Sequence, residues 1–434
     1  MKTVALATLG CKVNQCESAY LEEKLCKGNF HIRPFTEEAD LYCINTCAVT
    51  SRAAMQSRQL IRRAARLNSE AKIVVMGCYS QIAAEEISAI PGVTHILGTS
   101  EKLALLDYIS IGDEYTSTSI HLENARNAPA PTPLVFAAFS HRTRAFLKTQ
   151  DGCDAFCSYC IVPYARGRSR SIPLESILEQ VKKFLDNGYQ EIVLTGIHLG
   201  QWGFDLKPQQ ELIGLLRAIL GHYPPPRLRL SSLEPGEISA DLLALIASEP
   251  KICPHLHIPL QSGDAAILNR MNRHYHPNFY RQIVLEAIHR IPDLAVGVDV
   301  MVGFPGETEE RFQNTYRLIE SLPIAYLHIF PFSPRPGTPA AAMEEQISPA
   351  VIRQRCQLLR ELDKSKRLTF QNRFLGKVRP VLVENRQDKA TGLLCGFSDN
   401  YLPVLVQADT AIENMIVMAK LDTIEATKMI AIPV

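Results

Sequence analysis

The chain has 434 residues, 46% of them apolar, and its 46 basic and 45 acidic residues leave a formal net charge of +1. This composition excludes a disordered chain and leaves room for two or three domains with cores of their own. No apolar run approaches the roughly 20 residues that span a bilayer, so we expect a cytoplasmic protein with no membrane partner.

The first region alternates short apolar segments with helical stretches, which predicts a parallel α/β domain. The opening MKTVALATLGC is typical of a β-strand and not of a signal peptide. Expected strands lie at residues 4–9, 41–45 and 73–77.

Each of these strands runs directly into a cysteine, namely Cys11, Cys47 or Cys78. Ligands gather beyond the carboxyl ends of parallel strands, so the three thiols can meet at one edge of the sheet. The spacing alone leaves chance placement as an equal alternative. The remaining cysteines of this region are expected to be small buried residues, and they are Cys16, Cys26 and Cys43.

Basic residues gather in three stretches. Residues 50–68 hold five arginines and no acid, residues 353–373 are rich in Arg and Lys, and a short run contains Arg166, Arg168 and Arg170. Any one stretch is typical of a solvated helix face. Three in one chain favour a polyanionic partner such as RNA.

Residues 124–133, NARNAPAPTP, are typical of a linker. Beyond them, strands and helices alternate six times, which predicts an incomplete parallel (β/α) barrel with its chemistry at the C-terminal strand ends. The expected strands are residues 146–149, 191–195, 227–231, 255–259, 296–302 and 326–330. After residue 373, short apolar runs broken by turn residues predict a small antiparallel barrel.

A tight cysteine run follows the first barrel strand, with Cys153, Cys157 and Cys160 in the spacing C-x3-C-x2-C. Thiolates are the usual protein ligands of iron-sulfur clusters, and three of them leave one iron of a 4Fe-4S cluster open. A structural zinc site needs four ligands, and no fourth cysteine or histidine stands at such a spacing. Structural disulfides do not persist in a reducing cytosol. The run therefore favours an iron-sulfur cluster.

This spacing resembles that of the radical S-adenosylmethionine (SAM) enzymes, in which SAM binds the open iron. TLGCKVNQ at residues 8–15, NTCAVT at 45–50 and MGCYSQ at 76–81 extend the resemblance to the methylthiotransferases related to MiaB and RimO. GCKVNQ and GRSRS resemble the MtaB type of this family, which acts on N6-threonylcarbamoyladenosine at tRNA position 37. The tail, with GKVRPVLVE and GFSDNY, is similar to a TRAM domain.

The resemblance implies an N-terminal methylthiotransferase domain at 1–123, a radical SAM core at 139–369 and a TRAM domain at 372–434. It implies two 4Fe-4S clusters, one on Cys11, Cys47 and Cys78 and the other on Cys153, Cys157 and Cys160. SAM, a low-potential electron donor and a sulfur source would be required. The expected product is 2-methylthio-N6-threonylcarbamoyladenosine in tRNA.

Strand-end residues are the further candidates for SAM or nucleoside contacts, with loop or cap chemistry as the alternative. They are Gly196, Ser232, Gln261, Ser262, Asp299 and Gly303. Arg166 and Arg168 are candidates for contact with the tRNA backbone, or one of them with the SAM carboxylate.

Three other functions stay open. Two lie within the family, namely methylthiolation of isopentenyladenosine in tRNA and of an aspartate of a ribosomal protein. The third is a two-cluster electron carrier or RNA-binding protein without catalysis, against which the open irons implied by three-thiolate sites count.

Overall fold

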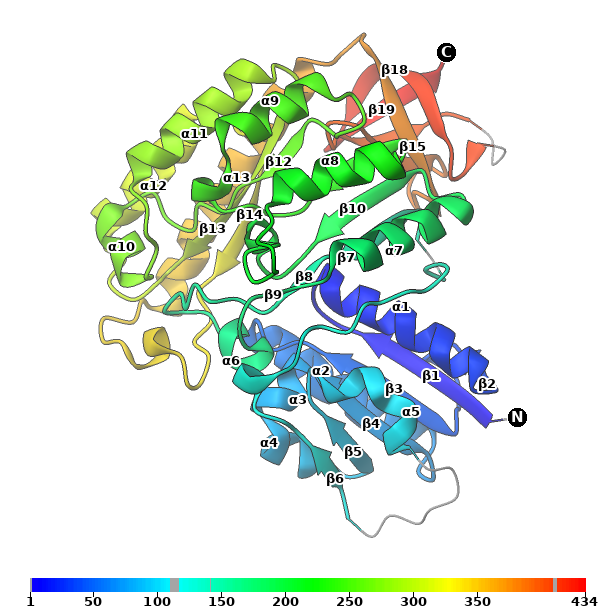
Figure 1. Ribbon diagram of the computed structural model, residues 1–434. Coiled ribbons are helices and arrows are strands. Elements are labelled where there is room, and N and C mark those ends of the chain that lie inside the picture. Colours follow the sequence, from blue (N-terminus) through cyan, green and yellow to red (C-terminus); the bar gives the residue numbers. More distant parts are fainter. Residues whose placement is uncertain (1, 110–116, 141, 409–411) are drawn as a thin grey trace.

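The computed structural model describes residues 2–109, 117–140, 142–408 and 412–434. The described chain forms an N-terminal parallel sheet, a central open barrel and a small C-terminal barrel (Figure 1). The fold class predicted from the sequence is confirmed. No helix in this part of the chain combines the length and apolar character needed to cross a bilayer.

The N-terminal sheet has the strand order β2-β1-β3-β4-β5-β6, and all of its pairs are parallel. Its strands are β1 (Lys2–Thr8), β2 (Phe30–Arg33), β3 (Leu41–Thr46), β4 (Lys72–Gly77), β5 (Val93–Leu97) and β6 (Ser119–His121). Its helices are α1 (Lys12–Lys27), α2 (Ser51–Leu67), α3 (Cys78–Ile82), α4 (Ala84–Ser88) and α5 (Leu105–Tyr108).

Alternate residues of β3 serve the two faces of this sheet, as the period of two in a strand requires. Tyr42 and Ile44 pack in one buried cluster with α2, while Leu41 and Cys43 pack in another with α1. Helix α1 also reaches the central barrel, because the thiol of Cys16 donates a hydrogen bond to the carbonyl of Phe146. The N-terminal sheet and the barrel thus share α1 (Figure 1).

The central barrel contains six parallel strands in two hydrogen-bonded sets, β11-β10-β7 and β12-β13-β14. A parallel bridge between Ser232 and His257 joins the two sets. The strands are β7 (Arg144–Lys148), β10 (Glu191–Thr195), β11 (Arg227–Leu230), β12 (His255–His257), β13 (Ala295–Val302) and β14 (Tyr326–Pro331). The six strands expected from the sequence are all present, with ends shifted by a few residues.

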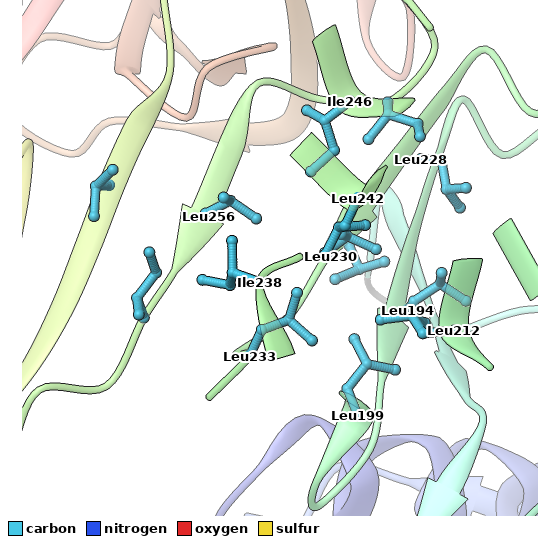
Figure 2. Close-up of a cluster of buried hydrophobic side chains, with 14 of the residues drawn as sticks. Leu194, Leu199, Leu212, Leu228, Leu230, Leu233, Ile238, Leu242, Ile246 and Leu256 are labelled. Carbon is cyan, nitrogen blue, oxygen red and sulfur yellow. The ribbon is translucent and has the colours of Figure 1, made fainter. Parts of the chain in front are cut away.

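Helices cover the outside of this barrel (Figure 1). They are α7 (Leu174–Asp186), α8 (Leu212–His222), α9 (Ala240–Ser248), α10 (Ala265–Arg270), α11 (Pro277–Arg290), α12 (Glu309–Ser321) and α13 (Pro349–Asn372). Strand leucines such as Leu194, Leu230 and Leu256 form a buried cluster with Leu212 of α8 and Leu242 of α9 (Figure 2). Short elements β8 (Gln150–Asp151), α6 (Val162–Arg166) and β9 (Arg170–Ser171) flank the cysteine run.

The C-terminal barrel is closed in the order β15-β16-β17-β19-β18. Its strands are β15 (Val378–Gln387), β16 (Leu394–Ser398), β17 (Pro403–Val406), β18 (Ile416–Glu425) and β19 (Lys428–Pro433). All of its pairs are antiparallel except β17 with β19. It docks on the central barrel, where Arg227 donates to the carbonyl of Pro380 and Arg229 to that of Asp399.

Candidate active site

One set of cysteines lies at the carboxyl edge of the N-terminal sheet. Cys11 is the N-cap of α1 after β1, Cys47 follows β3, and Cys78 begins α3 directly after β4. These three strands are neighbours in the sheet. A Cβ on Gly10 would lie 2.8 Å from the Cβ of Cys47, so the turn carrying Cys11 passes close to that side chain. The strand order therefore places Cys11, Cys47 and Cys78 at the same edge of the sheet, as predicted.

The same three thiols interact electrostatically. Burial raises the pKa of Cys47 to about 11, and the charges of Cys78 and Cys11 add to this effect. Thiols crowded in this way repel one another when ionised. A cation placed among them would hold them as thiolates.

A buried ionic network lies behind this set, between the N-terminal sheet and the central barrel. Glu17 of α1 pairs with Lys102, Lys148 and Arg166 at 2.5, 2.9 and 3.1 Å. Asp151 pairs with Lys148 at 2.6 Å and with Arg166 at 2.8 Å. Although burial opposes ionisation, the three cations hold the pKa of Glu17 well below its usual range. Three cations thus face two carboxylates.

Arg166 is the cation of this network that lies next to a cysteine of the first set, Cys78. Its Nε donates a hydrogen bond to the sulfur of Cys78 at 3.2 Å, and its Nη2 donates to Asn14. The arginine is 1% exposed. A buried positive charge beside these thiols fits an anionic thiolate-ligated cluster.

The second set of cysteines follows β8 at the rim of the central barrel. Burial raises the pKa of Cys160 to about 12, and the charges of Cys157 and Cys153 contribute to the shift. The backbone N–H of Ala155 donates to the sulfur of Cys153 at 3.4 Å, and Arg273 donates to that of Cys157 at 3.7 Å. Hydrogen bonds to the sulfurs are among the features that set cluster potentials.

His198 also touches this set, because its Nδ1 lies 3.5 Å from the sulfur of Cys153 and its Nε2 lies 2.7 Å from Glu237. Although burial opposes protonation, the interactions with Cys153 and Glu237 raise the pKa of His198 to about 10. A protonated imidazole here would place a positive charge beside the sulfur of Cys153.

The spacing of the thiols can be compared with the spacing that a single zinc ion requires. Among the described residues, only His257, Asp299 and His328 bring three ligand atoms within 4.8 Å of one another. A zinc ion with Zn–S bonds of about 2.3 Å would hold its sulfurs about 3.8 Å apart. In the described part of the chain neither cysteine set is that tight, so the thiols as placed do not form a zinc site.

Two cavities adjoin these sets. The first, of about 480 Å³, is lined by Cys157, His198, Glu234, Glu237 and Arg273 among others. The second, of about 250 Å³, lies inside the barrel and is lined by Lys12, Arg144, Arg229, Asp299 and Tyr401 among others.

The structure corrects the role predicted for Arg166. A side chain that is 1% exposed and bonded to Glu17, Asp151 and Cys78 cannot reach a tRNA backbone. Arg168, two residues on, is exposed. Cys26 is also exposed, contrary to prediction, whereas Cys16 and Cys43 are buried as expected. Local sequence shows neither which Arg of YARGRSRS is buried nor which residues of a helix are exposed.

The six strand-end candidates separate into groups. Ser232 and Asp299 line the second cavity. Gly196 lines neither cavity and lies two residues before His198, which lines the first. The hydroxyl of Ser262 lies 3.2 Å from that of Thr315, and Gln261 beside it has a φ of +63°. A Cβ on Gly303 would lie 2.3 Å from Ile352 of α13, so that glycine is required for helix packing.

Sequence reasoning missed several residues of the two sites. Glu17, Lys102, Lys148, His198 and Arg273 lie in segments without a motif, and their contacts join parts of the chain far apart in sequence. Their burial as charged residues would have been the only signal, and burial is not visible in one sequence.

Comparisons with known proteins agree with this arrangement. Residues 3–98 match the family described as Uncharacterized protein family UPF0004, and residues 147–319 match the Radical SAM superfamily. The Threonylcarbamoyladenosine tRNA methylthiotransferase MtaB of Bacillus subtilis is 38% identical, over 97% of this chain and 94% of its own. The MtaB of Thermotoga maritima is 36% identical over 93% of this chain and 91% of its own.

A related tRNA-2-methylthio-N(6)-dimethylallyladenosine synthase from Erythrobacter litoralis is 32% identical, over 96% of this chain and 94% of its own. Among solved structures, the radical S-adenosylmethionine methyltransferase TsrM from Kitasatospora setae is similar with a TM-score of 0.56. The two share 16% identity, over 78% of this chain and 77% of TsrM. This likeness concerns the fold alone.

Proposed function

Because the chain belongs to the radical SAM tRNA methylthiotransferase family, we propose that it transfers a methylthio group to C2 of N6-threonylcarbamoyladenosine at position 37 of tRNA. The observation that carries the proposal is the pair of three-thiol sites joined by Arg166. This arginine bonds Cys78 of one site and Asp151, two residues before Cys153 of the other.

We propose that Cys11, Cys47 and Cys78 hold one 4Fe-4S cluster, and that Cys153, Cys157 and Cys160 hold a second that binds SAM. When bound, the second cluster and SAM supply one-electron chemistry that can remove hydrogen from a carbon too weakly acidic for a base. The protein's own residues position these groups. Arg273 and His198 place positive charge on the thiolates of Cys157 and Cys153.

The first cavity is the proposed site of SAM. Glu234 and Arg273 line it as an ion pair, and their charges match the amino and carboxylate groups of a bound amino acid. Gly196, two residues before the lining residue His198, is retained as a candidate backbone contact. Ser232 and Asp299 lie in the second cavity, which we assign to the substrate instead.

Exposed arginines are the proposed tRNA contacts. Arg52, Arg62, Arg63 and Arg66 of α2 are exposed, as is Arg168. Helix α2 starts four residues after Cys47, so a phosphate backbone lying along it passes close to the cluster proposed on Cys11, Cys47 and Cys78, which we call the auxiliary cluster. By contrast, Arg355 of the second basic stretch is buried with Glu307.

The proposal requires a low-potential electron donor and a sulfur source, and it places the protein in the cytoplasm with its tRNA. The proposed domains are residues 1–123, 139–369 and 372–434. The sheet, the six-stranded barrel and the closed barrel support these limits.

The test is mass spectrometry of tRNA nucleosides from a strain lacking the gene and from the same strain carrying the parent, Cys157→Ala or Cys43→Ala. Cys43 is buried in β3 outside both proposed cluster sites, so it is the matched control. Parent and Cys43→Ala should restore 2-methylthio-N6-threonylcarbamoyladenosine, and Cys157→Ala should not. Restoration of a methylthiolated dimethylallyladenosine, or of a modified protein only, would contradict the proposed substrate.

A further inference from the structure

All three parts of the chain contribute to the second cavity. Lys12 comes from α1, Arg144 from β7, Asp299 from β13 and Tyr401 from the C-terminal barrel. Lys12 also directly follows Cys11, a proposed ligand of the auxiliary cluster. Any group bound in this cavity therefore lies next to the proposed cluster site of Cys11, Cys47 and Cys78.

One wall of the cavity has unused positive charge. Arg229 is satisfied by both carboxylate oxygens of Glu191. Arg144 pairs through a single nitrogen with Glu384 at 3.1 Å. Within the described parts of the chain, the ammonium of Lys12 has no ion pair or hydrogen bond, although the residue is half-buried. A half-buried cation without a partner is costly unless a ligand supplies the anion.

Another part of the cavity lining carries a hydrogen-bond acceptor. Asp299 lies 3.1 Å from His257 Nε2 and 3.2 Å from His328 Nδ1. Asp299, His257 and His328 line the same cavity as Lys12 and Arg144. Phe330, which also lines the cavity, is 42% exposed and offers a surface on which a base can stack.

We propose that this cavity recognises the N6 side chain of the modified adenosine, with Lys12 and Arg144 binding its carboxylate and Asp299 facing its hydroxyl and N–H donors. This inference rests on the proposed function. A threonylcarbamoyl group has one carboxylate and several donors, whereas a dimethylallyl group has neither. A dimethylallyl group would leave Lys12 without an anion, and sites built for a polar group reject analogues that lack it.

A carboxylate could also come from SAM, and a phosphate from the tRNA backbone. The first cavity, beside Cys157, already holds the Glu234–Arg273 pair for SAM. The enclosed setting of Lys12 among Arg144, Arg229 and Tyr401 fits a single side chain better than a nucleic-acid backbone. The experiment separates these sources.

The test uses the full-length, cluster-reconstituted enzyme and two anticodon stem-loop RNAs, one carrying N6-threonylcarbamoyladenosine and the other its methyl ester. The ester replaces the charged carboxylate with a neutral group that is larger by one methyl. For each RNA, kcat/KM for methylthiolation and Kd by fluorescence anisotropy are measured, together with SAM affinity and iron content. The variants are Lys12→Met and Arg144→Gln, and Lys27→Met at the exposed end of the same helix is the control.

The parent and Lys27→Met should prefer the acid over the ester by roughly 10-fold or more in kcat/KM and Kd, as expected for a hydrogen bond to a charged group. Lys12→Met and Arg144→Gln should reduce this preference by lowering activity on the acid alone. If Lys12→Met loses the neighbouring cluster, the acid-over-ester preference of Arg144→Gln decides the test, because Arg144 is not next to a proposed cluster cysteine in the sequence.

Equal treatment of acid and ester by the parent would overturn the inference. So would equal losses on both RNAs in Lys12→Met and Arg144→Gln, or a loss of SAM affinity alone. If the parent methylthiolates neither RNA, the proposed function fails, while the comparison of the two Kd values still decides whether the cavity reads the carboxylate.

Discussion

The Nε of Arg166 lies 3.2 Å from the sulfur of Cys78, and through this hydrogen bond the two proposed cluster sites become one unit. Arg166 ends α6, six residues after Cys160, and Cys78 begins α3 of the N-terminal sheet. The same guanidinium also bonds Glu17 and Asp151. A change in the position of Arg166 therefore alters contacts at both proposed cluster sites.

The first prediction concerns Arg166→Met. Removing this cation deletes its buried bonds to Glu17 and Asp151, while Lys102 and Lys148 still balance the two carboxylates, so we expect a loss of about 1–3 kcal/mol in the free energy of unfolding. Iron bound at the auxiliary site should also fall. Urea unfolding and iron analysis measure the two effects.

Arg168→Met is the matched control, since Arg168 is exposed two residues away. It should change the free energy of unfolding by no more than about 0.5 kcal/mol. Equal stability of the two variants would show that the buried network does not support the fold.

The second prediction separates the two clusters. The parent should bind about eight iron atoms, and Cys47→Ala and Cys157→Ala about four each, because each loses one three-thiolate site. Cys47→Ala should still cleave SAM, whereas Cys157→Ala should not. Iron analysis and 5'-deoxyadenosine assays give the two readouts.

Cys16→Ala and Cys43→Ala serve as controls for this pair, and both should keep the iron content of the parent, as they are buried outside the two sets. Loss of iron from either control would mean that the ligands are assigned to the wrong cysteines.

The third prediction tests the exposed arginines of α2. Replacing both Arg62 and Arg63 with Ala should weaken tRNA binding and lower the slope of log affinity against log salt by about 0.7–0.9 for each phosphate that is no longer neutralised. Filter binding at several salt concentrations gives the slope. Lys182→Ala on α7 is the control, because its ammonium pairs with Asp186 on the outside of the barrel. An unchanged slope in the double variant would remove α2 from the tRNA surface.

The fourth prediction concerns Glu307, in the turn after β13. Burial raises the pKa of Glu307 to about 7, although the N–H of Gly303 and the guanidinium of Arg355 oppose the shift. The folded state then holds this proton at pH values where the unfolded chain has released it. Stability should therefore fall as pH rises from about 5 to above 7, by about 1–3 kcal/mol.

Glu307→Gln should flatten this dependence, while Glu310→Gln, on the exposed start of α12, should leave it as in the parent. Urea unfolding at pH 5, 6, 7 and 8 provides the comparison. A parent whose stability rises across this range would contradict the shift.

Local patterns in the chain were enough to predict the succession of strands and the six cysteines proposed as ligands. Apolar runs of strand length and a C-x3-C-x2-C spacing are both short-range features, so one sequence displays them. Functional groups collect at the carboxyl ends of parallel strands, and this rule predicted that Cys11, Cys47 and Cys78 lie at one edge of the sheet.

The charged residues that serve those cysteines became visible only in the folded chain. Arg166 and Arg168 are alike in sequence, yet one is buried against Glu17 and the other exposed, because α6 packs against the N-terminal sheet. Lys12, Arg144 and Tyr401 meet in one cavity although nearly 400 residues separate the first from the last. Such pairings depend on how whole elements pack, and no local pattern encodes the faces that they turn toward one another.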